Sequence, residues 1–240
     1  MESELVRQAE TLFGETMTRR LEERATDGSA ASNTAETTDE TAERQAPAEA
    51  APDNAPPLLR LNMTARQQRK LWSHVESIEN FWQTLEELEP GVIGRLAAVA
   101  ADRRWEVIFL TKRPETVGQT AQVQSQRWLE SKGFPLPSVY VVQGSRGRIA
   151  AALGLDIVID DRPENCLDVV VDSKARAILV WREDEKQLPA AARRLGIGVV
   201  KSVGECLDIL TQVDASNGPP QPGVVARVKR LLGLKVPANV

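Results

Sequence analysis

The chain has 240 residues, of which 42% are hydrophobic and 27% are charged, and its net charge is −4. This composition is ordinary for a globular protein, and no apolar run approaches the roughly 20 residues of a membrane-spanning helix, so we expect no transmembrane segment. The acidic start is unlike a secretory signal, and the two cysteines, Cys166 and Cys206, lack CxxC spacing, which excludes a zinc knuckle and a disulfide scaffold. These features predict a cytoplasmic protein.

The charge is unevenly distributed along the chain. Residues 1–57 carry 13 acidic and 5 basic side chains, a net −8, whereas residues 58–240 carry a net +4. A mildly basic body suits a small phosphorylated ligand. It is too weakly charged to predict a nucleic-acid surface, so no nucleic-acid partner is expected.

The first 57 residues form two predicted segments. Residues 1–25 predict an amphipathic helix, which is either loosely attached or docked on the body or on a partner. Its apolar positions recur at helical spacing and are Leu5, Ala9, Leu12, Phe13, Met17 and Leu21. Residues 26–57 contain no Val, Ile, Leu, Met or aromatic residue. They predict a disordered linker, because they bury too little surface to offset the entropy of ordering.

Strands and helices alternate over residues 58–213. Short, uncharged apolar runs predict buried parallel strands, and they are Val107–Leu110, Val139–Val142, Ile157–Ile159, Ile178–Val180 and Val199–Val200. The predicted helices are Gly91–Asp102, Glu115–Ser131, Arg146–Leu153, Pro163–Val170, Glu185–Leu195 and Val203–Leu210. This alternation predicts an α/β fold, a doubly wound, Rossmann-like parallel sheet with helices on both faces.

Residues 214–240 form a predicted tail. The sequence GPPQPG predicts a flexible break, and VVARVKRLLGLKV predicts a basic amphipathic helix. Such a helix either docks its apolar face on the body or contacts an acidic membrane or a protein partner.

Candidate phosphate ligands follow two of the predicted strands, since chemistry in a doubly wound sheet lies at the carboxyl ends of its strands. Thr111 and Lys112 follow the first strand, and Pro114 is well placed to open the next helix. Arg146 and Arg148 enter a helix behind a glycine-flanked turn. Hydroxyl and basic side chains beside free helix amides are typical of phosphate sites, so we predict phosphate binding by these four polar residues.

Paired carboxylates end the third predicted strand. Asp160 and Asp161 lie in the segment IDDRPEN. Two buried carboxylates are costly unless they are hydrogen-bonded or share a cation, and hard oxygen ligands suit magnesium. The pair therefore predicts a Mg²⁺ site.

The order of these groups, together with the segments ELEPGV, FLTKRP and IDDRPEN, resembles the haloacid-dehalogenase (HAD) superfamily over residues 64–210. The closest likeness is to its deoxyribonucleotidase (type C nucleotidase) branch. The resemblance implies that Thr111 binds the transferring phosphoryl group and that Arg148 neutralises phosphate. It also implies that Asp160 and Asp161 supply the magnesium ligand.

The chain departs from the family in the motif that carries the nucleophile. Family members open with a strand ending in D-x-D-G, whose first aspartate attacks phosphorus, and no D-x-D occurs in this chain. One alignment puts LLRLN in the first-strand slot, so that Arg60 and Asn62 replace the aspartates. In the other, the segment joins the cap-like helices of residues 64–90 and the first strand is missing. Neither alignment leaves a phosphoryl acceptor.

Several other side chains have a structural and a functional interpretation. A set of aromatic and apolar residues either packs in the core, which is the commoner case, or stacks a nucleobase; it comprises Trp72, Phe81, Trp82, Leu85 and Trp105. His74 is expected at the surface without a partner. Cys166 and Cys206 are expected to pack as small apolar side chains.

Two functions from different classes stay open. The first is a HAD-like protein that has lost family-type phosphoryl transfer and acts as a ligand-binding or regulatory protein. The second is a magnesium-dependent phosphatase or nucleotidase that acts on a small phosphomonoester with a replacement nucleophile, such as metal-activated water.

Overall fold

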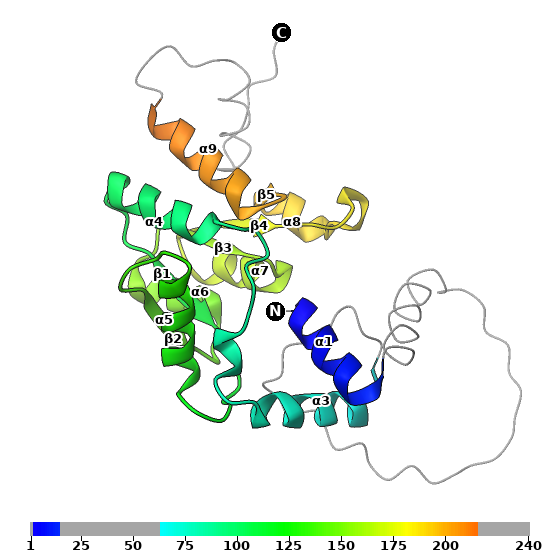
Figure 1. Cartoon of the computed structure of the whole chain (residues 1–240). Coiled ribbons are helices and arrows are strands. Elements are labelled where there is room, and N and C mark those ends of the chain that lie inside the picture. Colours follow the sequence, from blue (N-terminus) through cyan, green and yellow to red (C-terminus); the bar gives the residue numbers. More distant parts are fainter. Residues whose placement is uncertain (1, 15–62, 216–240) are drawn as a thin grey trace, which may run out of the picture. The chain divides into compact units, whose positions relative to one another are not determined.

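The computed structural model describes residues 2–14 and 63–215, which fall into two compact units (Figure 1). Unit 1 contains the described residues 2–14, 63–86 and 107–142, and unit 2 contains residues 87–106 and 143–215. The predicted linker, the segment LLRLN and the predicted basic helix of the tail lie outside the described residues.

Unit 1 is built from helices and one pair of strands. Its elements are α1 (Glu2–Phe13), α3 (Ala65–Ser77), η1 (Phe81–Gln83), β1 (Ile108–Thr111), α5 (Ala121–Ser131) and β2 (Ser138–Val141). The two strands pair in parallel, with Ile108 opposite Ser138 and Thr111 opposite Val141. Helix α3 begins with a capping box, in which Thr64 and Gln67 satisfy each other's backbone amides.

The core of unit 1 lies where α1, α3 and η1 meet. Trp72, Phe81, Trp82 and Leu85 are at most 4% exposed. The prediction that the aromatic residues around α3 are core side chains is confirmed for this group. Trp105 packs elsewhere, against the apolar cluster of unit 2 that includes Ile178.

Unit 2 is an α/β structure with a three-stranded parallel sheet in the order β3-β4-β5. Its elements are α4 (Val92–Arg103), α6 (Arg146–Leu153), β3 (Ile157–Asp160), α7 (Pro163–Asp172), β4 (Arg176–Val180), η2 (Glu185–Gln187), α8 (Ala190–Arg194), β5 (Gly198–Val200) and α9 (Val203–Ala215). The five strands of the two units lie at the predicted apolar runs, which confirms those predictions within one or two residues at each end.

Helices cover both faces of the sheet in unit 2. Ala177 and Leu179 of β4 pack in one apolar cluster, with residues of α6, α7 and α8. Ile178 and Val180 pack in another, with residues of α9. Alternate residues of a strand point to opposite faces, so β4 contributes to two layers of core and is almost wholly buried.

Several predicted helix boundaries were wrong, and the helix expected over Val203–Leu210 continues to Ala215. The helix expected from Glu115 begins at Ala121, because Thr120 caps it by accepting a hydrogen bond from the amide of Val123 at 3.3 Å. Pro114 therefore lies in a loop and does not open a helix. The helix expected over Glu185–Leu195 is split into η2 and α8 at Pro189, since a proline disfavours helical geometry in the residue before it.

The remaining single-residue predictions have mixed outcomes. Cys166 and Cys206 are fully buried, as expected. His74 has a partner, contrary to expectation, because its Nε2 lies 3.0 Å from Oε1 of Gln8 in α1. None of the helices in the described ranges combines the length and apolarity needed to cross a membrane.

Glu89 of the ELEPGV segment caps a helix that begins 114 residues later. Its carboxylate accepts hydrogen bonds from the amides of Val203 at 3.0 Å and Gly204 at 2.9 Å, and from Arg182 at 2.7 Å. Partial burial alone would raise the pKa of Glu89, but these hydrogen bonds and the Arg182 charge outweigh it and lower the pKa. The ionised carboxylate thus stabilises the N-terminus of α9.

We expect Glu89→Gln to destabilise unit 2 by about 1–2 kcal/mol at neutral pH, because it removes the charge from these hydrogen bonds. A lowered pKa means that the stabilisation is present above the unfolded pKa, near 4.3, and is lost as the pH falls through the folded pKa. Chemical denaturation at several pH values should therefore show a difference from wild type that shrinks below about pH 4. Glu106→Gln, an exposed change in the same unit, is the control. An equal loss at pH 3 and pH 7 would contradict the prediction.

Candidate anion-binding site

The carboxyl end of β3 holds Asp160 in a fixed hydrogen-bonded position. Its Oδ1 accepts from the amide of Arg162 at 2.9 Å, and both oxygens accept from Nδ2 of Asn165 at 3.0 Å. Arg162 is the N-cap residue of α7 and makes no side-chain cap, and Pro163 follows it at the helix start. Asp160 therefore anchors the first turn of α7 to the end of the strand.

Burial raises the pKa of Asp160, and this is the largest influence on it. The hydrogen bonds from Asn165 and Arg162 oppose the rise, as does the positive charge of Arg146, while the negative charge of Asp161 adds to it. The raised pKa means that burial disfavours the ionised form of this carboxylate.

The N-terminus of α6 supplies the basic part of the site. Ser145 caps the helix, because its Oγ accepts from the amide of Arg148 at 3.2 Å. Gly147 lets α6 approach α7 closely, since a Cβ at this position would lie 2.1 Å from the carbonyl oxygen of Asp168. The close contact brings the first turn of α6 against α7, which itself starts from β3.

Arg146 is the most unusual side chain in this region. It is only 9% exposed, and its Nη1 is buried without a hydrogen-bond partner among the described residues. Burial lowers its pKa, while the charge of Asp160 opposes the change. A buried guanidinium nitrogen with no acceptor is costly, so an acceptor brought to this atom would be stabilising.

The structure brings only some of the predicted residues together. Arg146 is buried and Asp160 is half-buried, and the charge of Asp160 influences the pKa of Arg146. Arg148 and Asp161, beside them in sequence, are exposed. Thr111 ends β1 and Lys112 follows it, both in unit 1, so their part in phosphate binding stays a prediction.

The magnesium site at Asp160 and Asp161 stays a prediction. Oδ1 of Asp160 already accepts two hydrogen bonds and Oδ2 accepts one, and the side chain is close enough to Arg146 to feel its charge. No group of three or more histidine, cysteine, aspartate or glutamate side chains suited to a metal is present in residues 2–14 and 63–215.

Cys166 is poorly suited to act as a nucleophile. It is fully buried below Asp160, and burial, helped by the Asp160 charge, raises the pKa of its thiol to about 12. The thiol is therefore protonated at neutral pH, and only the thiolate is strongly nucleophilic.

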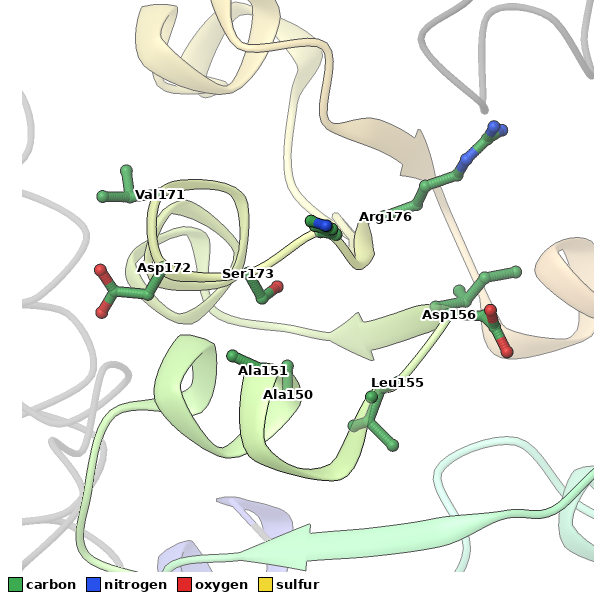
Figure 2. Close-up of a pocket in the computed structure, with 11 residues that line it drawn as sticks. Ala150, Ala151, Leu155, Asp156, Val171, Asp172, Ser173 and Arg176 are labelled. Atoms are coloured by element: carbon green, nitrogen blue, oxygen red, sulfur yellow. The ribbon is translucent and has the colours of Figure 1, made fainter.

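A pocket of about 860 Å³ lies at the other end of β3 (Figure 2). It is lined by the C-terminal ends of α6 and α7 and by the starts of β3 and β4, with Ala151 on the α6 side and Val171 on the α7 side. Its charged residues are balanced, Asp156 and Asp172 against Lys174 and Arg176. Asp160 is at the opposite end of the strand, but Asp172 of the pocket lining accepts a hydrogen bond at 3.3 Å from Ser145, the N-cap residue of α6.

Sequence reasoning missed a polar network inside unit 1. Gln124 is fully buried, and its Oε1 accepts from the amide of Trp82 at 2.9 Å. Arg113 lies over the Trp82 ring, 5.1 Å from its centroid, and donates to Ser125 at 2.7 Å. Burial lowers the pKa of Arg113 to about 10, so it stays charged at neutral pH. The only sequence signal for Arg113 was its position next to Lys112 in the FLTKRP segment.

Comparison of the chain with protein-family models, with curated proteins and with solved structures gives no match. The resemblance to the HAD superfamily is therefore a prediction from the sequence motifs alone.

Proposed function

We propose that the chain is a HAD-like protein, with the doubly wound sheet of that superfamily, that binds a small phosphorylated ligand without family-type phosphoryl transfer. The observation that carries the proposal is the buried Nη1 of Arg146, which has no hydrogen-bond partner among the described residues. The order of the motifs and the helices on both faces of the sheet in unit 2 support the fold.

A phosphate group would supply an acceptor for Arg146 and a negative charge at the N-terminus of α6. Its oxygens would accept from Arg146 in a charge-assisted hydrogen bond, which is about twice as strong as a neutral one. The free amides in the first turn of α6 would add donors, and the helix dipole favours negative charge there. The charge of Asp160 favours the protonated form of Arg146, but it also limits how tightly an anion can bind, because the carboxylate repels it.

Binding of inorganic phosphate and of a nucleoside monophosphate to the full chain tests the proposal by calorimetry. We expect Arg146→Gln to weaken binding at least tenfold, because it removes the charged donor, a loss of about 1.4 kcal/mol or more. Arg194→Gln, which makes the same change in charge on an exposed residue of α8, should bind like wild type. Equal affinities for all three proteins, or no binding to any, would refute the site.

Phosphate release separates this function from the alternative of a hydrolase. We expect no release from nucleoside monophosphates or an aryl phosphate, with or without magnesium, above that of an Asp160→Asn, Asp161→Asn variant. Magnesium-dependent turnover that disappears in the variant would show instead an enzyme with a replacement nucleophile.

A further inference from the structure

Helix α1 covers an apolar face of α3 in unit 1 (Figure 1). Leu5 and Ala9 are 1% and 0% exposed, and Leu71 and Val75 of α3, in the same cluster, are each 0% exposed. The contact buries the apolar stripe of both helices, so α1 is a packed part of unit 1.

Polar contacts fix how α1 lies on this face. Gln8 Oε1 lies 3.0 Å from Nε2 of His74, and Lys70 Nζ lies 5.5 Å from the centre of the Phe13 ring. These two contacts are more than one helical turn apart along α3, so they define the direction of α1 as well as its place.

The two helices carry opposite charges. Helix α1 has three glutamates and one arginine, a net −2, and α3 has three basic residues and one glutamate, a net +2 with histidine neutral. Charge complementarity of this kind selects partners and guides their association.

Helix α1 is a separate segment of the chain. Its end at Phe13 and the start of α3 at Ala65 are separated by about 50 residues, so no short connection forces the two helices together. Their contact is therefore equivalent to a peptide helix bound on a receptor face, helped by the high effective concentration that a covalent connection provides.

We propose that the α3 face is a binding site for an acidic amphipathic helix, that α1 fills it as a removable ligand, and that α1 of a second copy can take the same place. The second copy is the occupant because each chain carries a helix with the required apolar spacing, charge and contacts to His74 and Lys70. Exchange of an identical element between protomers is a low-cost route to a dimer.

A labelled peptide of residues 1–14 tests the binding site. The full chain with Leu5→Asp and Ala9→Asp should bind this peptide at least tenfold more tightly than the wild-type chain, whose own α1 fills the face. A peptide with the same two substitutions should bind at least tenfold more weakly. Equal binding to both chains, or no binding to the variant up to 1 mM peptide, would overturn the proposal. Should the variant lose its thermal transition, Leu5→Ala with Gln8→Ala replaces it, because these changes remove contacts without adding charge.

Sedimentation of the full chain between about 10 µM and 1 mM tests the second copy, since intramolecular docking competes at millimolar effective concentration. We expect a dimer whose fraction rises over this range and which the double variant does not form with itself. A wild-type chain that stays monomeric at 1 mM, or a dimer that persists in the variant, would contradict exchange between copies.

Discussion

Gly147→Ala should destabilise unit 2 by about 3 kcal/mol or more, because overpacking against backbone leaves little room for relief. The new Cβ would lie 2.1 Å from the carbonyl oxygen of Asp168 and 2.7 Å from its carbonyl carbon. Both are backbone atoms of α7, so only a movement of one helix away from the other relieves the clash. Thermal or urea unfolding measures the loss.

The sign of this effect is informative. Alanine in a helix is intrinsically better than glycine by about 1 kcal/mol, so a loss of stability identifies the contact with α7. Gly144→Ala is the matched control, because a Cβ there meets nothing within 4 Å. Unchanged or increased stability in Gly147→Ala would show that α6 and α7 do not pack as described.

The same variant bears on the proposed function. Gly147 follows Arg146 in the first turn of α6, so a displaced helix moves both the guanidinium and the free amides. We expect phosphate affinity to fall together with stability, whereas Arg146→Gln should lower affinity alone.

Gln124→Leu should destabilise unit 1 by about 3 kcal/mol, since each buried polar group left unpaired costs about 1–3 kcal/mol. Leucine is similar in size but lacks the polar groups. The amide of Trp82 would lose its acceptor, and the carbonyl of Gln119 and the hydroxyl of Thr116 would lose a donor. The loss should appear in the same unfolding experiments, followed by tryptophan fluorescence.

Gln122→Leu provides the comparison on the same helix. Gln122 is exposed, two residues before the buried Gln124, and exposed substitutions usually change stability by less than about 0.5 kcal/mol. Similar losses in the two variants would mean that the network around Trp82 does not stabilise unit 1.

The candidate site combines a buried guanidinium with a hydrogen-bonded carboxylate. Nη1 of Arg146 has no hydrogen-bond partner among the described residues, and Asp160 accepts hydrogen bonds from Asn165. Under the proposed function, these groups recognise an anion without converting it. The calorimetric and phosphate-release experiments separate these two properties, because they measure binding and turnover independently.

The sequence alone determined the strands and most helices of the described chain. Apolar runs rich in β-branched residues, such as Ile157–Ile159 and Ile178–Val180, predicted strands buried in a parallel sheet, and this pattern depends only on local composition. Helix α6 was predicted with its observed ends because a capping serine precedes it and a glycine follows it. The absence of D-x-D is also a property of the sequence.

Only the tertiary structure decided which side chains are free and which are held. Arg146 and Arg148 look equivalent in sequence, yet one is buried without an acceptor and the other is exposed. Glu89 caps a helix 114 residues away, and α1 packs on a helix about 50 residues beyond it. These roles depend on partners brought together by folding, and a local pattern carries no information about such distant neighbours.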